Sequence, residues 1–466
     1  MLPDPSILLA DAPRVRDGLG EAGWSAAALE ELLGPGYREH LDRGELAPLA
    51  RRATGRSAIA RLARALVVGE PADGLLPASW VGRDGRALVR LQAVPHGGVE
   101  VVVPHDPGNA RATVATDQVL GAGAASMTLA AATPRDPAAR ALDLGSGAGV
   151  QALLAEDHCD SVVATDRNPR AVALTQLGAV LNGAQIDCRH GDLLEPVTGE
   201  LFDLVVSNPP FVIGPSQTYT YRDAGLGGDE VSRRLVRDIP PLLAPGGHAV
   251  LLVNWLHLEG EDGDERIRSW FEGTGVDGWV VQRELAAPDD YVTAWLRDTD
   301  ESAFDALFDP WLDSLAGVDA VAFGVVALHR RTDGLPPEVR LDVVDQPVAA
   351  TWGEEVVAHF QRRALGDVMG LRLRLREDVR RSEVCARGDE GWSVEARWLQ
   401  QEAGLRWNGA LDPYGASLLA ACDGRVPMGA LVSVLAAATG LDEEDAMRQI
   451  TPVVSRLVAQ GFLVPA

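Results

Sequence analysis

The sequence predicts an α/β protein with a doubly wound sheet, a helical N-terminal domain before it and a winged-helix-like C-terminal domain after it. Residues 106–330 alternate apolar, strand-length runs with helical stretches, which is typical of parallel strands joined by crossover helices. Residues 1–105 are mainly helical in pattern and end in a small strand region. Residues 331–466 begin as a connector with strands and end in three helices and an apolar strand. We therefore expect three domains.

The N-terminal domain carries recognisable helix signals. The stretch SAAALEELLG opens at Ser25, a residue type that caps helices, and closes on Gly34 before a proline. A second helical stretch is expected over residues 51–70. The runs ALVRLQAV and GVEVVVP that follow have strand composition.

The central domain is predicted from four strand-like runs, RALDLG, SVVATD, FDLVVSNPP and GHAVLLVNW, with helical stretches such as PRAVALTQLGAVLNG between them. The run FGVVALHRR is expected to be the last strand of the same sheet. In such sheets, ligands bind at the carboxyl ends of the strands. Candidate functional residues are therefore sought where these runs end.

Composition and charge narrow the class of protein. The chain has 466 residues and a formal net charge of −25, and its 42 basic residues are all arginine. This charge repels nucleic acid at long range, so any nucleic-acid binding would need a local basic patch. We expect no membrane span and no signal peptide, and hence a cytoplasmic protein, because no long apolar stretch or basic leader is present. The four cysteines are scattered along the chain, at Cys159, Cys188, Cys385 and Cys422. This spacing predicts neither disulfides nor a metal site.

A glycine-rich turn follows the first strand of the central domain. In ALDLGSGAGVQ, the strand is expected to end at Leu144, and Gly145, Gly147 and Gly149 follow at alternate positions. Glycine allows positive φ and close approach of the backbone to a ligand. The spacing is G-x-G-x-G, which differs from the G-x-G-x-x-G pattern of dinucleotide-binding proteins. A glycine-rich turn without a ligand is the alternative.

Aspartates follow the next two predicted strands. Asp166 ends the second strand, about twenty residues after the glycines, where a carboxylate is placed to accept hydrogen bonds from ribose hydroxyls. Asp192 lies where the third strand would end, placed to accept a bond from an adenine amino group. A helix cap and a turn residue, respectively, are the alternative interpretations. The neighbouring His190 is interpreted as a surface or turn histidine.

The fourth predicted strand stops abruptly in FDLVVSNPPFVIGP, because two adjacent prolines continue neither a strand nor a helix. Together and in this order, the motif Asp143-Leu-Gly-Ser-Gly-Ala-Gly, Asp166, Asp192 and Ser207-Asn-Pro-Pro-Phe211 resemble class I AdoMet-dependent methyltransferases, which have a Rossmann-like sheet. The subgroup resembled carries an [S/D/N]-P-P-[Y/F/W] motif. It includes nucleic-acid adenine and guanine amino-methylases and HemK-type enzymes that methylate a protein glutamine. The resemblance covers roughly residues 110–255.

The resemblance implies S-adenosyl-L-methionine (AdoMet) as cofactor and methyl transfer to a planar nitrogen. Such a nitrogen is a poor nucleophile because its lone pair is delocalised. The side-chain oxygen of Asn208 and the carbonyl of Pro209 would each accept one N–H and favour localisation of the lone pair. Pro209 and Pro210 would preorganise these acceptors, and Phe211 would stack on the planar group. No metal is required.

Further residues receive roles from the same resemblance. The cofactor would be held by Asp143, Gly145, Ser146, Gly147, Gly149, Asp166, Arg167, Asp192, Leu193, Asn208 and Thr116. The segment ATDQVLGAGAASMTLA, residues 115–130, lies one helix before the glycine turn, and in the resembling enzymes this segment helps to cover the methionine part of AdoMet. Thr116 and Asp117 are the candidates there, and a helix start capped by threonine is the alternative. Tyr219, Tyr221 and Arg222 are candidates for a lid over the acceptor, or for an exposed loop without function. The motif ends in Phe where HemK-type enzymes usually carry Tyr, so the substrate of those enzymes does not transfer directly.

Three functions remain open from the sequence. A base amine of RNA or DNA is favoured by arginine-rich segments, Arg51–Arg64 and the alternating Arg372, Arg374 and Arg376, and by the winged-helix-like domain. Glu377 and Asp378 could neutralise the second segment. Methylation of a glutamine or asparagine amide in a protein is favoured by the acidic chain, and a non-catalytic binding module is the third interpretation. The N-terminal domain is expected to recognise substrate, and the C-terminal domain is a candidate for homodimer formation.

Overall fold

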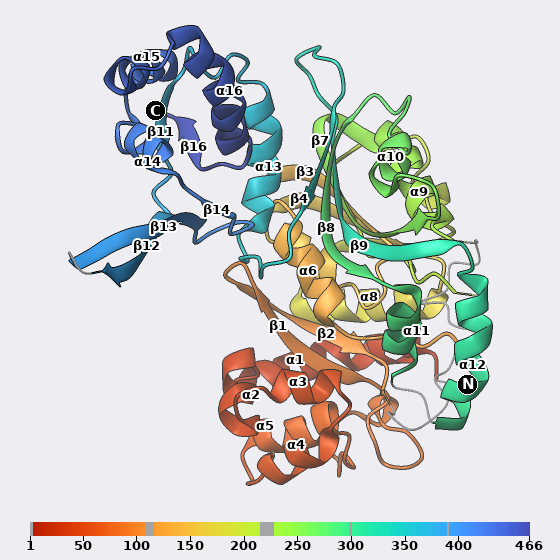
Figure 1. Ribbon diagram of the computed structural model, residues 1–466. Helices are drawn as coiled ribbons and strands as arrows, with labels where there is room; N and C mark the ends of the chain where they lie inside the picture. The colour runs from red at the N-terminus through yellow and green to blue at the C-terminus, as the bar shows by residue number, and fades with distance from the viewer. Residues whose placement is uncertain (1–2, 109–115, 215–227, 298–300, 389–390) are drawn as a thin grey trace. The chain divides into compact units, whose positions relative to one another are not determined.

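The structure is a computed structural model that describes residues 3–108, 116–214, 228–297, 301–388 and 391–466 (Figure 1). The chain divides into two compact units. The first comprises residues 1–130 and 135–343, and the second comprises residues 131–134 and 344–466. The helical N-terminal region and the central sheet both lie in the first unit, so a domain boundary at residue 105 stays a prediction.

The first unit is organised around an eight-stranded sheet with the order β10-β8-β9-β7-β6-β3-β4-β5. Strand β3 lies inside the sheet, with β4 and β5 following it on one side and β6 and β7 on the other, as the doubly wound pattern predicts. All neighbouring pairs are parallel except those of β9, which is antiparallel to both β7 and β8. The strands are β3 (Ala138–Leu144), β4 (Cys159–Asp166), β5 (Ile186–His190), β6 (Phe202–Ser207), β7 (Leu243–Leu258), β8 (Asp277–Ala286), β9 (Val318–His329) and β10 (Val339–Val343).

The doubly wound sheet confirms the predicted fold class, with two differences. The run FGVVALHRR, which we expected to be the last strand, forms most of β9 inside the sheet. A further strand, β10, follows after residue 330 and pairs with β8 at the edge. It is short and carries alternating charges, Arg340 and Asp342, which gives little of the apolar signal of a buried strand.

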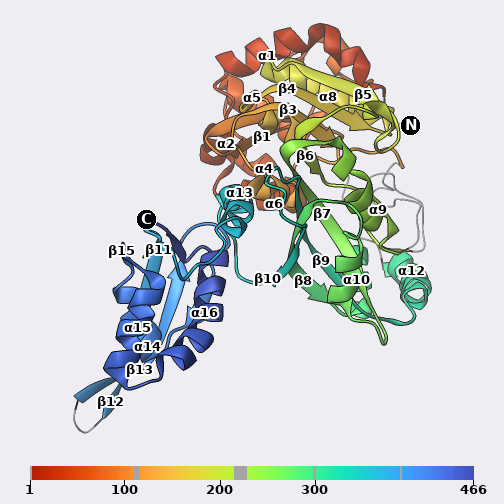
Figure 2. The same ribbon diagram turned by 90° about the horizontal axis from the view of Figure 1, so that it is seen from above.

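Helices cover both faces of the sheet (Figure 2). On one face, α8 carries a long buried surface that packs with α7 and the N-terminal region, and Leu174 and Leu177 are fully buried there. On the other face, α9 and α10 pack on strand residues such as Val205 and Leu251. The helices are α6 (Ala124–Ala132), α7 (Val150–Ala155), α8 (Pro169–Asn182), α9 (Glu230–Asp238), α10 (Gly263–Ser269), α11 (Pro288–Leu296) and α12 (Glu301–Ser314).

In the N-terminal region, one predicted helix forms as its capping residues indicate, and the other is broken into shorter pieces. Ser25 caps α2 by accepting a hydrogen bond from the Ala28 N–H, 3.1 Å away, and Gly34 ends the helix with φ of 86°. The stretch over residues 51–70 is broken into the end of α4, α5 and a π-helical turn, because Ser57 starts a new helix by capping Ala60. The elements are α1 (Ala12–Glu21), α2 (Ala26–Leu33), α3 (Tyr37–Asp42), α4 (Leu46–Arg52), α5 (Ala58–Ala63) and the antiparallel pair β1 (Arg90–His96) and β2 (Val99–His105).

The second unit contains the three C-terminal helices and the terminal strand that the sequence predicts. The helices pack around a small sheet of order β15-β11-β16, in which β16 is the terminal strand. Its winged-helix character stays a prediction. A helix, α13, begins at Trp352 in the segment that we expected to form strands only, and a long hairpin of β12 and β13 follows. The elements are α13 (Trp352–Arg363), β11 (Arg372–Leu375), β12 (Val379–Gly388), β13 (Gly391–Gln401), β14 (Asn408–Ala410), α14 (Pro413–Ala420), β15 (Asp423–Pro427), α15 (Met428–Thr439), α16 (Glu443–Ala459) and β16 (Leu463–Pro465).

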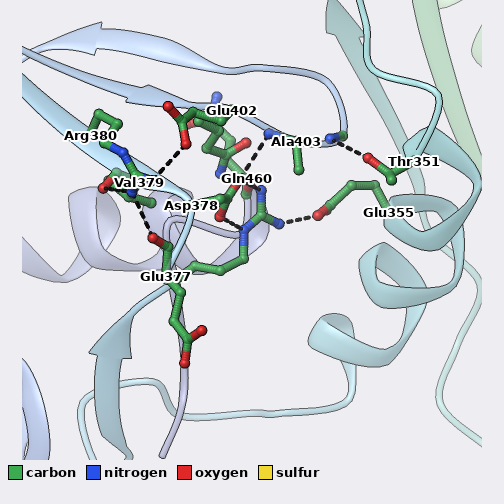
Figure 3. A network of polar contacts seen from close by, with 12 residues as sticks. Thr351, Glu355, Glu377, Asp378, Val379, Arg380, Glu402, Ala403 and Gln460 are labelled. Atoms are coloured by element: carbon green, nitrogen blue, oxygen red, sulfur yellow. Dashed lines mark hydrogen bonds and ion pairs between the residues drawn. The ribbon is translucent and has the colours of Figure 1, made fainter.

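A partly buried ionic network connects α13 to the segment before β12 in the second unit (Figure 3). The Arg376 guanidinium donates to Glu355 on α13 and to Asp378 before β12. Asp378 also accepts the Ala403 N–H, 3.0 Å away. Arg376 is therefore occupied inside the unit, and the arginines at 372, 374 and 376 do not form a basic stripe of three free side chains. In the described part of the chain, no helix is both long and apolar enough to cross a membrane.

Candidate active site

A cavity of about 470 Å³ opens where β3, β4, β5 and β6 end at one edge of the sheet. Its walls come from the glycine turn after β3, the ends of β4 and β6, the turn after β5, the segment before and at the start of α6, and α9. Most of the residues predicted from the sequence line this one cavity: Asp143, Gly145, Ser146, Gly147, Asp166, Arg167, Asp192, Leu193, Asn208, Pro209 and Pro210. Segments far apart in the sequence thus converge on one space.

The glycine turn has the backbone geometry that the sequence predicts. Gly145, Gly147 and Gly149 have φ values of 74°, 54° and 79°. A Cβ on Gly145 or Gly147 would meet nothing within 4 Å, so their backbone is open toward the cavity. A Cβ on Gly149 would lie 2.9 Å from Cγ2 of Thr175 on α8. Gly149 is not among the cavity-lining residues, and close packing of α7 against α8 is the visible reason for its glycine.

Asp166 connects the end of β4 to the glycine turn. One carboxylate oxygen accepts the Gly147 N–H at 2.9 Å, and the other accepts the Asn168 N–H at 2.8 Å. Burial raises the pKa of Asp166 above its usual range, although these two hydrogen bonds oppose the shift. Each oxygen retains a further lone pair for a ligand hydroxyl.

Asp143 lies beneath the glycine turn and holds the start of α7. It is 2% exposed, and its carboxylate accepts the Ala152 N–H at 2.9 Å. Burial raises the pKa of Asp143 to about 7, against the effect of that hydrogen bond. The cavity therefore contains a carboxyl group that changes charge near neutral pH.

The Asn-Pro-Pro segment enters the cavity from the end of β6. Ser207 pairs with Leu144 in the β3–β6 ladder, and its hydroxyl donates to the Leu144 carbonyl at 2.7 Å. Asn208, Pro209 and Pro210 then line the cavity. Phe211 is not among the lining residues, and its ring packs against Phe323 of β9 with 5.4 Å between ring centroids. Stacking of Phe211 on an acceptor stays a prediction.

The remaining predicted residues lie elsewhere. Thr116 is exposed and does not line the cavity, and α6 begins only at Ala124, so Thr116 does not cap this helix. The Asp117 carbonyl accepts from the Asn168 side chain at 2.9 Å, which ties this segment to the end of β4. His190 is exposed at the end of β5, as expected. Tyr219, Tyr221 and Arg222 lie outside the described residues.

Sequence reasoning located one part of the cavity wall only as a segment and missed another. The segment of residues 115–130, expected to cover the cofactor, lines the cavity through residues 118–121 and 123–126, and not through Thr116 or Asp117. Gln151 fixes this segment by donating to the Ser126 carbonyl at 2.7 Å. Arg234 and Leu235 of α9 form another part. Gln151 lies one turn after the glycines, a position that could have drawn attention. Nothing in the sequence of α9 distinguishes a cavity-lining arginine from its neighbours.

Metal ligation has no candidate in the described ranges, since they hold no group of three His, Cys, Asp or Glu side chains placed around one point. The cysteines of these ranges are free thiols. What the cavity offers is backbone N–H groups, carboxylates and the amide of Asn208.

The strand order, the reversed strand β9 and the glycine turn facing the Asn-Pro-Pro segment across one cavity define a class I methyltransferase domain. Residues 120–262 match the family model of the Methyltransferase small domain. Residues 21–87 match the Domain of unknown function (DUF7059), and residues 357–465 match the Domain of unknown function (DUF7782). The central residues thus match a family named for methyltransferases, whereas the families matched on either side carry no assigned function.

Curated relatives share this central part. The release factor glutamine methyltransferase of Geobacter sulfurreducens is 34% identical over 152 residues, covering 30% of this chain and 51% of that protein. The ribosomal RNA small subunit methyltransferase C of Alcanivorax borkumensis is 32% identical over 115 residues, covering 25% of this chain and 32% of that protein. The chain therefore spans about half, or less, of the length of these relatives.

Among solved structures, the chain is similar to the T. Thermophilus 16S rRNA N2 G1207 methyltransferase in complex with AdoMet and guanosine. The two are 26% identical, with 36% of this chain and 42% of that chain covered and a TM-score of 0.28.

Proposed function

We propose that this chain is an AdoMet-dependent N-methyltransferase that transfers a methyl group to a planar amino or amide nitrogen of a macromolecule. One observation carries the proposal: the glycine turn, Asp166, Asp192 and the Asn208–Pro210 segment line one cavity at the carboxyl edge of the sheet. The match of residues 120–262 to a methyltransferase family supports it. The curated relatives are named as a glutamine methyltransferase and a ribosomal RNA methyltransferase.

The cavity fits AdoMet in size and in chemistry. Its volume of about 470 Å³ lies within the roughly 300–1,000 Å³ of pockets that enclose drug-sized ligands. Gly145 and Gly147 leave room for close approach of the ligand, and Asp166 offers carboxylate lone pairs to the ribose. Asp192 and Leu193 would border the adenine. When bound, AdoMet supplies an electrophilic methyl group on its sulfonium.

The protein's own contribution is to hold the acceptor nitrogen. The Asn208 side-chain oxygen and the Pro209 carbonyl accept its two N–H groups, which restrains the –NH₂ and favours localisation of its lone pair. Their backbone is stiffened by two prolines and anchored at Ser207 on the β3–β6 ladder. Preorganised acceptors of this kind need no rearrangement when the nitrogen becomes a nucleophile.

A base amine of RNA or DNA is the first acceptor class that we propose. The similarity to a ribosomal RNA methyltransferase supports it. A glutamine or asparagine amide in a protein is the second. One structural observation favours it: Arg376 is occupied by Glu355 and Asp378 inside the second unit, so a basic stripe that would support RNA binding is incomplete.

Transfer of tritium from labelled AdoMet distinguishes these classes. Purified protein is incubated with extract from a strain that lacks the gene, and aliquots are treated with RNase, DNase or protease. Label removed by a nuclease identifies a base amine, and label removed only by protease identifies a protein amide. AdoMet binding without label in any fraction would contradict the proposed function and support a non-catalytic binding module.

A further inference from the structure

The connection between β8 and β9 lies at the same edge of the sheet as the cavity. Because β9 is antiparallel to both β7 and β8, the carboxyl end of β8 and the start of β9 share the edge at which β6 ends. This connection holds two neighbouring helices, α11 and α12 (Figure 1). Both helices pack with Ile213 in a common apolar cluster. Ile213 follows Phe211 of the Asn-Pro-Pro-Phe motif by two residues.

The backbone that leaves this motif lacks anchors of its own. The β6 ladder ends at Ser207, and Pro209 and Pro210 have no N–H to donate. Among the hydrogen bonds of the described residues, none holds the backbone of residues 208–212. Ile213 is therefore the first anchored residue after Ser207, and whatever holds Ile213 fixes the far end of the motif.

Two side chains of the α11–α12 connection hold Ile213 by both of its backbone groups. Its N–H donates to the Tyr291 hydroxyl at 2.9 Å, and its carbonyl accepts from the Trp311 indole N–H at 2.8 Å. Ile213 is 4% exposed, Tyr291 7% and Trp311 3%. Buried hydrogen bonds of this kind are costly to break, because each freed group stays unsatisfied.

The neighbouring contacts restrict the same segment. A Cβ on Gly214 would lie 2.8 Å from the Trp311 ring, so the backbone there lies directly on the indole. Phe211 packs against Phe323. Phe323 pairs in register with Asn254 of β7, whose amide donates to the Tyr291 hydroxyl at 3.3 Å. Tyr291 thus joins the end of the motif to the strand beside it.

We infer that Tyr291 and Trp311 are positioning residues that hold Ile213, and through it keep the Asn208 oxygen and the Pro209 carbonyl aimed at the acceptor nitrogen. The inference rests on the proposed function, since it assumes that these two acceptors hold the nitrogen. Neither side chain lines the cavity. Their loss therefore leaves the cofactor's contacts in place and misplaces the motif. Misplacement by about 1 Å costs on the order of 10²-fold in rate.

Tyr291→Phe and Trp311→Phe test this inference. Each removes one hydrogen bond to Ile213 and keeps an aromatic ring. Tyr37→Phe and Trp270→Phe are matched controls, because both side chains are buried in the same unit away from the motif. Three quantities are measured: hydrogen exchange of the peptide containing Ile213, the dissociation constant for AdoMet by calorimetry, and the rate of tritium transfer to cell extract at several AdoMet concentrations.

Both test variants should show faster exchange at Ile213, an unchanged AdoMet dissociation constant, and a turnover lowered by about tenfold or more at unchanged KM for AdoMet. Both controls should behave like the wild type in all three measurements. Faster exchange with unchanged turnover would overturn the inference, and so would unchanged exchange. If the wild type itself binds AdoMet but transfers no label, the proposed function fails, and the inference fails with it.

Discussion

A substitution of Asn208 is the most direct test of how the site holds the acceptor nitrogen. Its side chain lines the cavity, whereas the cofactor-binding groups lie on the glycine turn and at the ends of β4 and β5. Asn208→Ala should lower turnover by about 10²–10³-fold, the usual effect of removing one preorganised polar group. AdoMet affinity should stay the same. Calorimetry and label transfer on the same preparation measure both.

Asp166→Ala tests the cofactor side of the site, because the Asp166 carboxylate accepts the Gly147 N–H and lines the cavity. It should weaken AdoMet binding. Retained turnover in Asn208→Ala would contradict the role of the Asn-Pro-Pro segment. Unchanged AdoMet binding in Asp166→Ala would contradict the ribose role.

Asp143 should make AdoMet binding depend on pH. Burial raises its pKa to about 7, so the carboxyl group is mostly neutral at pH 6 and mostly charged at pH 8. AdoMet carries positive charges, which the ionised carboxylate attracts. Affinity should therefore rise between pH 6 and pH 8, by up to about tenfold. Calorimetry across this range measures the change, and Asp143→Asn should flatten the profile. A flat profile in the wild type would rule out this role.

At the scale of single elements, the glycine turn contains two glycines that should respond differently to alanine. Gly149 has φ of 79°, and a Cβ added to it would lie 2.9 Å from Cγ2 of Thr175, so Gly149→Ala meets both backbone strain and a clash. It should lower the free energy of unfolding by about 2–4 kcal/mol. Gly145→Ala, with φ of 74° and open space, should lower it by about 1–2 kcal/mol. Denaturant unfolding, monitored through hydrogen exchange of peptides from α7, measures both free energies of unfolding.

Gly145→Ala should weaken AdoMet binding more than Gly149→Ala, since Gly145 lines the cavity and Gly149 does not. The opposite order of affinities would show that Gly149, and not Gly145, faces the cofactor.

The ionic network of the second unit should depend on Glu355, whose carboxylate accepts from both Arg362 and Arg376. Glu355→Gln leaves the partly buried guanidinium groups of Arg362 and Arg376 with less compensation for their charge. It should destabilise the second unit by about 2–4 kcal/mol. Hydrogen exchange of α13 peptides measures the loss. Glu377→Gln is the matched control, because that carboxylate is 93% exposed and lies 3.9 Å from Arg374. Equal effects of the two substitutions would contradict the importance of the network.

Elements were predictable from the sequence where local signals agreed with the final packing. Strands β3, β4 and β6 are apolar runs that end in turn residues, and α2 has a serine cap and a glycine end. The helix α13 was missed although Glu354 and Glu355 in its first turn and Arg362 and Arg363 in its last turn suit a helix dipole. The segment before α6 was predicted to cover the cofactor, but its lining residues were not, because tertiary contacts such as that of Gln151 decide which of them face the cavity.

At the scale of the whole molecule, the cofactor cavity belongs to one unit. Its lining residues all lie between Gln118 and Leu235, within the first unit. A variant that ends at Val343 should therefore bind AdoMet with an affinity within about threefold of the full chain, a difference below about 0.7 kcal/mol. Calorimetry on the two proteins measures this. Loss of binding in a variant that keeps its helical circular dichroism would show that the second unit contributes to the cofactor site.

The direction of β9 has a further consequence for how such a domain diversifies. Because β9 runs against its neighbours, the chain leaves and re-enters the sheet at the edge where the acceptor is handled, through one continuous segment between Ala286 and Val318. An insertion in that segment adds contacts to the acceptor and leaves the order of the strands intact. Descendants of one enzyme could exchange this segment alone, and so acquire a new target while inheriting the cofactor chemistry unchanged.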